Sequence, residues 1–370
     1  MPCPYKVDAA SYVGAFRLTT CNGACSMPRI CGRVVAISFG THRMNIKRLL
    51  GLEKMQPVEA ASAEPGPVAT NSSAESAEGE TVQEPAAEAP SVLLAFPPGH
   101  FYSPINDPDA LLPQQQRLWP GDGVCAGIDF DDESQLAHLA AIKQHMPLYD
   151  YADEFDATCE PPRFSHGNDQ FGWFDSRALF GLLLHYRPKN LIEIGGGYSS
   201  LLTADVNHRL LGDSVNFISI EPYPRPFLQK GFAGLTQLIT QKVEEVPHAV
   251  FDVLGEGDIL FIDSSHVSKA GSDVNYLFFD ILPRLRKGVL IHVHDIYLPY
   301  EYPRHWVIDE NRSWNEQYVL RALLMYSTAF KVLFGSHYAF RKFPHKVAEV
   351  LNLPDGRAFG GGSLWLRKTE

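Results

Sequence analysis

Short apolar runs alternate with helical stretches through the second half of this 370-residue chain. Five runs are almost continuously apolar, as strands covered by helices on both faces must be. They span 191–195, 216–221, 237–243, 258–263 and 289–294. Two more, 331–335 and 363–367, follow a predicted helix over 314–326, and a further helix is predicted over 271–286. Strand and helix in alternation predict an α/β fold with a doubly wound, Rossmann-like, mostly parallel sheet of seven strands.

The N-terminal quarter has a different composition. Residues 57–90 consist mainly of Ala, Glu, Ser and Pro, so we expect a disordered acidic linker that has too little apolar surface to fold. Residues 1–56, which carry eight Lys or Arg and two Asp or Glu, are predicted to form a poorly ordered leader. We predict that 91–175 form an N-terminal cap region with a helix over 132–145, and that 176–370 form the domain that carries the site.

Composition and charge limit the classes of partner. The chain is 45% hydrophobic and 20% charged, which is typical of a soluble globular protein. No apolar run approaches the ~18 residues of a membrane span, and no secretory signal pattern opens the chain, so we expect a cytoplasmic protein without a membrane partner. The net charge of −11 repels phosphate backbones, which argues against nucleic acid and favours a small molecule or a sugar as substrate.

The six cysteines give a weak signal. Cys21, Cys25 and Cys31 lie close together, but they lack the paired C-x-x-C spacing of a zinc knuckle. We interpret them as free thiols, which fits a reducing cytoplasm, and a metal or redox role is the alternative.

A glycine-rich loop follows the first apolar run. Gly195, Gly196 and Gly197 come after the predicted strand and before a helix that begins near Ser199. Glycines let the chain turn tightly against a ligand, although an ordinary strand-to-helix turn has the same composition. Ser200 stands where the dinucleotide fingerprint G-x-G-x-x-G has its third glycine, so the loop departs from that pattern.

Two acidic residues flank this loop. Glu193 lies inside the apolar first run, where a carboxylate is costly to bury without a hydrogen-bonding or cationic partner. Glu221 ends the second run, where a carboxylate can accept hydrogen bonds from ribose hydroxyls. An acidic residue, one spacer and G-x-G resemble the first motif of class I S-adenosylmethionine-dependent methyltransferases.

That resemblance implies roles for these residues. The loop holds the methionine portion of S-adenosylmethionine in this family, and the second acidic residue holds its ribose. The cofactor-binding roles then fall on Glu193, Gly195, Gly196, Gly197 and Glu221. Glu244, just after the third run, is a weaker candidate for the adenine edge, and Asp263 is a further candidate for cofactor contact.

Two polar motifs end the fourth and fifth predicted strands. They are Asp263-Ser-Ser-His266 and His292-Val-His294-Asp295, at the edge where open α/β sheets place their sites. Carboxylates and an imidazole that converge on a cleft can hold a divalent cation. The alternatives are that Asp263 caps the following helix and that His266 is an ordinary hydrogen-bonded polar residue.

These motifs resemble the metal-dependent small-molecule O-methyltransferases, including those that act on macrolide sugars. In that group an Asp after the fourth strand and an acidic pair after the fifth bind magnesium, and a His three residues after the first Asp is the base. Asp263, His266 and Asp295 match this pattern. His294 stands where an acidic residue is usual, and an imidazole favours softer transition metals. The implied metal ligands are Asp263, His294 and Asp295.

The function expected from these motifs is methylation of a hydroxyl group of a small molecule or sugar. His266 would accept the proton, because an imidazole titrates near the working pH, and a divalent cation such as magnesium would assist. Aromatic residues after the fifth strand suit a sugar or aromatic acceptor, or else pack the loop on the core: Tyr297, Tyr300, Tyr302 and Trp306. An aromatic cluster at 168–176 could close over the cofactor. A nicotinamide-dependent oxidoreductase and a non-catalytic nucleoside-binding module are the two alternatives.

Overall fold

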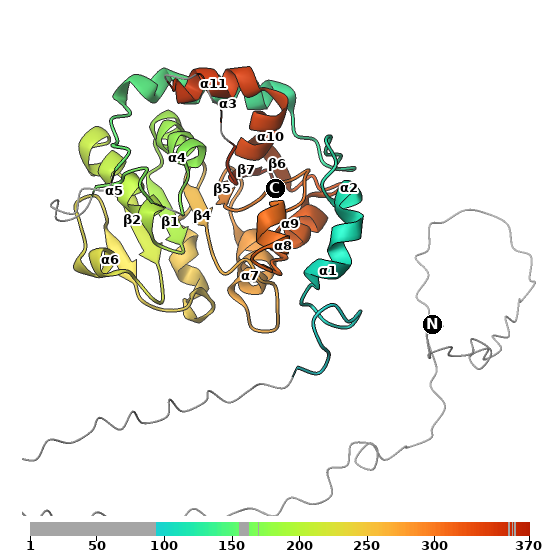
Figure 1. Ribbon diagram of the computed structural model, residues 1–370. Coiled ribbons are helices and arrows are strands. Elements are labelled where there is room, and N and C mark those ends of the chain that lie inside the picture. The colour runs from blue at the N-terminus through green and yellow to red at the C-terminus, as the bar shows by residue number, and fades with distance from the viewer. Residues whose placement is uncertain (1–93, 155–162, 169, 354–355, 357, 359) are drawn as a thin grey trace, which may run out of the picture. The chain divides into compact units, whose positions relative to one another are not determined.

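The structure, a computed structural model, describes residues 94–370 apart from 155–162, 169, 354–355, 357 and 359 (Figure 1). These residues fall in one compact unit that begins at Ala87. The predicted leader (1–56), the predicted linker (57–90) and all cysteines except Cys125 lie outside the described residues.

A seven-stranded sheet forms the centre of the described unit, in the strand order β3-β2-β1-β4-β5-β7-β6 (Figure 1). β7 runs antiparallel to β5 and β6, and the pairings among β1–β5 are parallel. The predicted doubly wound, mostly parallel sheet of seven strands is therefore confirmed. The strands are β1 Asn190–Ile194, β2 Asn216–Ile220, β3 Gln237–Ile239, β4 Ile259–Ile262, β5 Leu290–Val293, β6 Phe330–Gly335 and β7 Leu364–Lys368.

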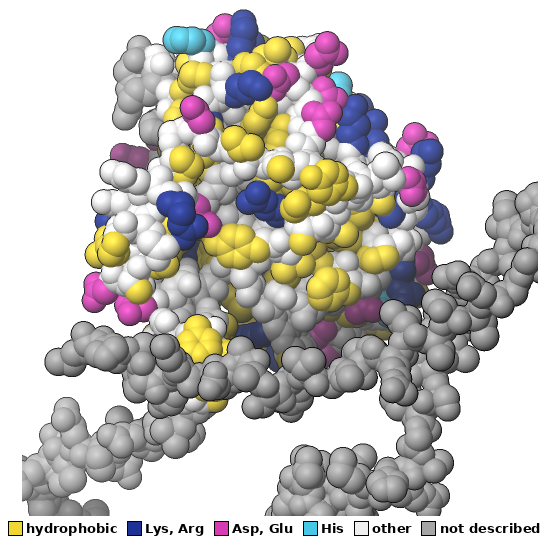
Figure 2. All heavy atoms as spheres, turned by 90° about the vertical axis from the view of Figure 1, so that its right-hand side faces the viewer, with side chains coloured by type: hydrophobic (Ala, Val, Ile, Leu, Met, Phe, Trp, Pro, Cys, Tyr) yellow, Lys and Arg dark blue, Asp and Glu magenta, His cyan; other side chains and the backbone are white. Residues whose placement is uncertain are grey.

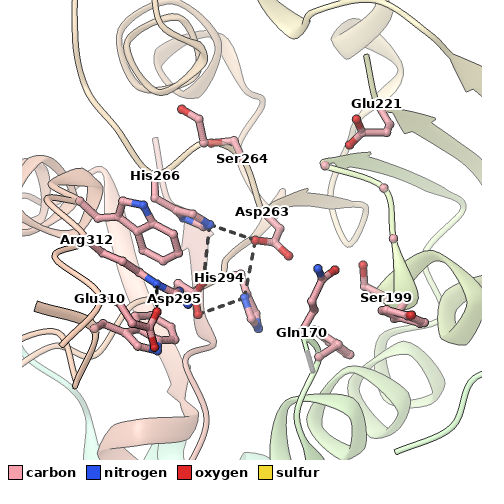
Figure 3. A pocket seen from close by; sticks show the side chains of 18 of the residues that line it. Gln170, Ser199, Glu221, Asp263, Ser264, His266, His294, Asp295, Glu310 and Arg312 are labelled. Atoms are coloured by element: carbon pink, nitrogen blue, oxygen red, sulfur yellow. Dashed lines mark hydrogen bonds and ion pairs between the residues drawn. The ribbon is translucent and has the colours of Figure 1, made fainter. Parts of the chain in front are cut away.

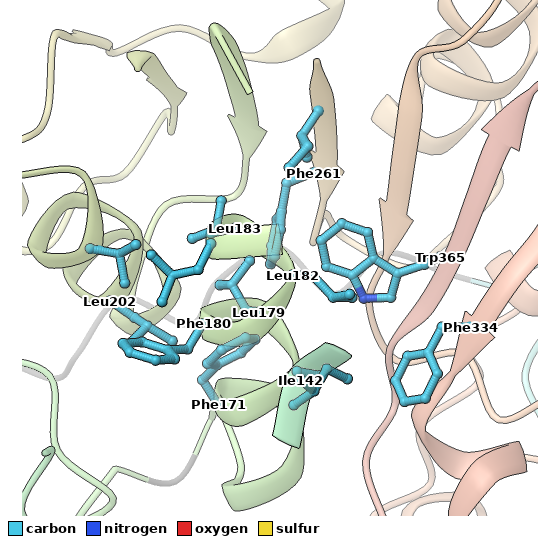
Figure 4. Packing of buried hydrophobic residues seen from close by; sticks show 14 of the residues in the cluster. Ile142, Phe171, Leu179, Phe180, Leu182, Leu183, Leu202, Phe261, Phe334 and Trp365 are labelled. Atoms are coloured by element: carbon cyan, nitrogen blue, oxygen red, sulfur yellow. The ribbon is translucent and has the colours of Figure 1, made fainter. Parts of the chain in front are cut away.

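The sheet has a hydrophobic core on each face, because alternate strand residues point to opposite sides. Leu191 of β1 packs in the core that includes α4 (Trp173–Tyr186) and α5 (Tyr198–Leu210). Its neighbour Ile192 packs in the other core, together with α7 (Asp273–Tyr276) and α9 (Glu316–Leu324). Figure 4 shows the first of these cores, where the rings of Phe261 and Trp365 lie beside the leucines of α4.

Shorter helices connect and cover these elements. The remaining helices are α1 Pro108–Leu111, α2 Gln115–Leu118, α3 Asp132–His145, α6 Pro226–Lys230, α8 Arg304–Ile308, α10 Ser336–Lys342 and α11 Pro344–Leu351. The prediction for 132–145 is confirmed with the same bounds as α3.

The helix predicted over 271–286 is not a single α-helix. After α7 the chain makes a π-helical turn, Leu277–Ile281, and then a 3-10 turn, Leu282–Arg284. Pro283 explains the break, since proline has no N–H to donate and its ring clashes with the preceding turn. The predicted apolar face is buried all the same, from Val274 to Leu285.

The segment predicted as a cap contacts several parts of the unit, and its helix α1 lies against α8. Helix α3 lies against α4, α11 and β6. Of this segment, Gln170 and Phe171 reach the cavity described below. The division into a cap (91–175) and a methyltransferase domain (176–370) stays a prediction.

The surface carries charges of both signs. On the face shown in Figure 2, Lys and Arg side chains alternate with Asp and Glu, and hydrophobic side chains lie between them. Within the described residues no helix is both long enough and apolar enough to span a membrane.

The central strand contains a buried carboxylate. Glu193 of β1 is 1% exposed, and the hydroxyl groups of Ser199 and Ser200 donate to it, the former over 2.7 Å. Both serines lie in the first turn of α5, so Glu193 ties this helix to the strand before it. Burial raises the pKa of Glu193 from 4.5 to about 7, although the serine hydroxyls oppose this shift.

This raised pKa predicts how pH changes the stability of the fold. Between pH 4.5 and 7 the folded protein keeps a proton that the unfolded chain releases. Glu193 therefore stabilises the fold fully below pH 4.5, and this contribution is lost as the pH rises through 7, by about 1.4 kcal/mol per pH unit. Glu193→Gln has no ionisable group at this position, so its stability does not include this pH-dependent contribution. We expect the difference in unfolding free energy between wild type and variant, from urea denaturation, to change across this window, and a flat difference would contradict the assignment.

Candidate functional site

A cavity of about 760 Å³ opens where β1, β2, β4 and β5 end (Figure 3). The loop after β1, Glu221 after β2, the residues 263–266 after β4 and the residues 294–295 after β5 all line it. This convergence follows from the parallel sheet, because the carboxyl ends of its strands meet at one edge. The sequence motifs, which are spread over a hundred positions, thus surround one space.

The three glycines of the loop have different surroundings. At Gly195, where φ is +86°, an added Cβ atom would lie 1.7 Å from the carbonyl oxygen of Asp263. At Gly196 it would lie 2.5 Å from Oγ of Ser219, whereas at Gly197 no heavy atom lies within 4 Å. Gly195 and Gly196 are therefore required by the protein's own packing, and Gly197 faces open space that a ligand can occupy.

A second cavity, of about 520 Å³, adjoins the first on the side of β2 and β3. Gly195, Glu221 and Asp263 line both cavities, and Glu244 lines the second one. One oxygen of Glu221 accepts a hydrogen bond from the N–H of Tyr223 at 2.7 Å, and burial raises the pKa of its carboxyl group. The predicted ribose and adenine residues therefore lie along one wall that runs from the glycine loop to Glu244.

Glu193 is the one predicted cofactor residue that lines neither cavity. Its carboxylate is occupied by Ser199 and Ser200 beneath the loop. The structure thus places Glu193 in support of the loop, which explains why an acidic residue sits in an apolar strand.

Across the first cavity from Glu221 and Ser199, two carboxylates and two imidazoles form a polar cluster (Figure 3). Its members are Asp263, His266, His294 and Asp295. Nε2 of His266 lies 3.4 Å from Asp263 Oδ1 and 3.5 Å from Asp295 Oδ2. Nδ1 of His294 lies 3.6 Å from Asp263 Oδ1 and 3.5 Å from Asp295 Oδ1. The four side chains predicted for metal binding and base catalysis are therefore together. His292 does not line the cavity: its ring stacks on Phe261 in the core, with its centroid 5.7 Å from that of His294.

The cluster has the donor set that a divalent cation requires. Ligand atoms of Asp263, His266 and Asp295 lie within 4.8 Å of one another. His294 is 4% exposed, and neither of its ring nitrogens makes a hydrogen bond within the described part of the chain. Buried imidazole nitrogens without hydrogen bonds, next to converging carboxylates, fit a cation bound between them.

The carboxylates control the charge of both imidazoles. Burial alone lowers the pKa of His266, but Asp263 and Glu316 outweigh it and raise this pKa to about 10. Burial likewise lowers the pKa of His294, whereas Asp263 and Asp295 raise it well above its ordinary value. In the absence of a bound cation, the charges of the cluster therefore compensate one another.

Two residues of the cluster have strained backbones. His266 has a φ of +61° and Asp295 a φ of +56°, in the left-handed region that residues with a Cβ atom seldom adopt. Such conformations persist only where the surroundings impose them, and they concentrate at functional sites.

An aromatic wall closes the first cavity beyond the cluster. Trp306 of α8 and Trp314 enclose the guanidinium of Arg312, which lies 4.3 Å and 4.7 Å from their ring centroids. Arg312 also pairs with Glu310, whose Oε2 lies 2.6 Å from its Nε. His305 completes this wall.

Of the four aromatic residues predicted to contact an acceptor, only Trp306 lines the cavity. Tyr302 is buried in the core, where its hydroxyl accepts the N–H of Gln317 at 3.0 Å. Tyr297 packs edge-on against Trp306. The alternative reading, that these tyrosines pack the loop onto the core, holds for Tyr302.

Sequence reasoning missed several residues at the site. Glu310 and Arg312 come from an irregular segment without periodicity. Trp314 stands at the start of the predicted helix over 314–326, but the helix begins only at Glu316, where an acidic residue is common for electrostatic reasons alone. Gln170 and Phe171 belong to the aromatic cluster noted at 168–176, which was a weak positional signal.

A family model described as a methyltransferase domain matches residues 192–296. The match includes the glycine loop, Glu221 and both polar motifs. An uncharacterized protein of Archaeoglobus fulgidus is 36% identical over 170 residues, which make up 44% of this chain and 76% of that protein.

Two solved structures are similar at a low level. A protein of Klebsiella pneumoniae assigned as an O-methyltransferase has a TM-score of 0.30 and 15% identity, over 71% of this chain and 96% of that one. A protein of Plasmodium falciparum assigned as a protein-L-isoaspartate O-methyltransferase, in complex with S-adenosyl-L-homocysteine, has a TM-score of 0.24 and 16% identity, over 51% of this chain and 84% of that one.

The family match covers the segment that builds the site, and the relative shares more than a third of its residues with this chain over most of its own length. The sheet supplies the architecture that the sequence motifs predicted. The chain belongs to the class I S-adenosylmethionine-dependent methyltransferases.

Proposed function

We propose that this methyltransferase methylates a hydroxyl group of a small molecule or sugar, with His266 as the base and a divalent cation at the neighbouring carboxylates. One observation carries the proposal: Asp263 lines both the cavity suited to the nucleoside and the cavity that contains the imidazole–carboxylate cluster. A methyl donor and a deprotonated acceptor can therefore meet beside it.

The methyl donor would lie along the wall from the glycine loop to Glu244. Gly195, Gly196 and Gly197 would contact its methionine portion, and Gly197 leaves the open space for it. Glu221 would accept the hydrogen bonds of the ribose hydroxyls, with Glu244 near the adenine. Glu193 would act beneath them by holding the first turn of α5.

The acceptor would occupy the first cavity, between the cluster and the aromatic wall. Flat apolar rings next to charged hydrogen-bonding groups suit the alternating apolar and hydroxyl-bearing faces of a sugar. Trp306 and Trp314 supply the rings, and Glu310 and Arg312 supply the polar groups.

The chemistry needs one proton transfer. The acceptor oxygen forms a bond to the sulfonium methyl carbon as the carbon–sulfur bond breaks, and its proton passes to Nε2 of His266. The products are a methyl ether and S-adenosylhomocysteine. A cation held by Asp263, His294 and Asp295 would lower the pKa of the acceptor hydroxyl, and would offset the negative charge that otherwise keeps His266 protonated.

The two alternatives are less well supported. A nicotinamide-dependent oxidoreductase calls for the third glycine of the dinucleotide fingerprint, where this chain has Ser200. A non-catalytic nucleoside-binding module would not explain why a strained, charged cluster lies beside the proposed nucleoside site, since such clusters concentrate at functional sites.

The proposed base predicts a loss of methyl transfer in His266→Ala. The assay follows labelled methyl groups from S-adenosylmethionine into a small-molecule extract of cells that lack the gene. We expect the rate to fall roughly 100-fold or more, the range in which general bases contribute. Binding of S-adenosylhomocysteine, measured by calorimetry, should stay unchanged. An undiminished rate in the variant excludes His266 as the base, and no transfer by the wild type favours the non-catalytic module.

The glycine loop predicts a contrast between two variants. Gly197→Ala adds a methyl group to open space, so the melting temperature should stay near that of the wild type while affinity for S-adenosylhomocysteine falls. Gly195→Ala drives a Cβ atom into the backbone of Asp263, so the protein itself should be destabilised. Equal affinity of Gly197→Ala and wild type would show that the ligand does not approach this side of the loop.

The cation site predicts selective loss of metal binding. With S-adenosylhomocysteine present, Asp263→Asn and Asp295→Asn should weaken binding of Mn²⁺, followed by electron paramagnetic resonance, by more than roughly 10-fold. Glu310→Gln is the matched control, because this carboxylate lines the same cavity but pairs with Arg312. If the wild type fails to bind Mn²⁺, or if the control loses as much as the aspartate variants, the cation site is wrong.

A further inference from the structure

A carboxylate that has no part in the proposed chemistry lies directly behind His266. Glu316, the first residue of α9, is 0% exposed, and its Oε2 lies 2.9 Å from Nδ1 of His266. Its Oε1 has no hydrogen-bond partner among the residues that the structure describes. A buried carboxylate with one unsatisfied oxygen costs free energy, so an apolar side chain would serve a purely structural position better.

Backbone contacts fix Glu316 in this place. The N–H groups of Asn315 and Glu316 both donate to the carbonyl oxygen of His266 over 3.1 Å. Oδ1 of Asn315 accepts the N–H of Ser268 over 2.6 Å. The indole of Trp314 packs against the imidazole, with 4.3 Å between the ring centroids. Residues 314–316 thus enclose the ring of His266 and fix its position relative to α9.

The hydrogen bond to Glu316 determines which nitrogen faces the cavity. An ionised carboxylate can only accept, so Nδ1 of His266 carries the hydrogen in both the neutral and the charged ring. Nε2 then faces Asp263 and Asp295, at 3.4 Å and 3.5 Å. Carboxylates placed behind imidazoles fix ring orientation and tautomer in this way at metal and catalytic sites.

We propose that Glu316 is the positioning residue for His266, and that it directs Nε2 to the point where Asp263 and Asp295 converge. The inference rests on the proposed function, in which Nε2 takes up the proton of the acceptor. It adds a residue that lies 50 positions beyond His266 and does not line the cavity.

The competing role for Glu316 is anchoring of α9. Glu301 provides a matched control for that role, because its carboxylate accepts a hydrogen bond from the hydroxyl of Tyr318 in α9 over 2.6 Å. Loss of this anchor would disturb the helix without removing the hydrogen bond to His266. Glu301→Gln should therefore show the effect of a weakened α9 anchor while the hydrogen bond between Glu316 and His266 stays intact.

The first experiment detects the hydrogen on Nδ1 directly. Protein labelled with ¹⁵N-histidine is studied by NMR in the presence of S-adenosylhomocysteine, and His266→Ala identifies the resonances of this ring. We expect a strongly downfield proton bonded to Nδ1 in wild type and in Glu301→Gln. It should move upfield in Glu316→Gln, since a neutral amide accepts more weakly, and disappear in Glu316→Leu. An unchanged downfield proton in Glu316→Leu overturns the proposal.

The second experiment measures methyl transfer from labelled S-adenosylmethionine to the cell extract. Glu316→Gln should lower the rate roughly 10–100-fold without changing the affinity for S-adenosylhomocysteine. In the His266→Ala background the same substitution should have no further effect, because Glu316 acts through that ring. An equal loss in both backgrounds, or the same loss in Glu301→Gln, overturns the proposal. A full rate in His266→Ala alone refutes the proposed base, and the NMR experiment still decides whether Glu316 orients the ring.

Discussion

The close approach of β1 and β4 at their carboxyl ends is the constraint on which the site depends. The strands run in register, with Ile194 beside Ile262, and the next residue, Gly195, touches the backbone of Asp263. Only a residue without a Cβ atom can turn there at a left-handed φ. Because the strand ends meet, the loop that starts α5 and the carboxylate of Asp263 share a cavity with Glu221. A larger residue at this turn would move the loop away from Asp263.

The second constraint is the burial of charge at this edge of the sheet. Asp263 and Asp295 face two imidazoles, and Glu316 meets one of these rings from behind. Each charge is tolerable only in the presence of the others, since an isolated buried charge is strongly destabilising. The left-handed backbones of His266 and Asp295 add to the cost. The fold compensates with two hydrophobic cores, one on each face of the sheet, so the strain and the charge are confined to the end where the strands finish.

Most of the fold could be predicted from the sequence, because buried parallel strands and amphipathic helices leave periodic patterns. Prediction failed where local chemistry interrupts the pattern, as at Pro283, which converts one predicted helix into π and 3-10 turns. Residues that follow strands, such as Gly195 and Asp263, could be expected to line one cavity, because the topology of a parallel sheet brings strand ends together. Glu316 and Arg312 could not be found in this way. Arg312 lies in an irregular connection, and Glu316 begins α9. The positions of both residues depend on tertiary contacts, and their residue types are common on any surface.

His294, which stands where the metal-dependent O-methyltransferases usually have an acidic residue, places an imidazole between carboxylates of the site. Its Nε2 lies 3.6 Å from Asp175, a buried carboxylate that also accepts hydrogen bonds from Ser363. An acidic residue at 294 would face Asp175 at close range with no positive charge between them, and buried like charges repel strongly. The imidazole of His294 therefore separates Asp175 from Asp263 and Asp295. Asp175 lies behind this ring and does not line the cavity. Anything bound between the two inner carboxylates then meets nitrogen as well as oxygen donors, and this mixed set favours a transition metal over magnesium.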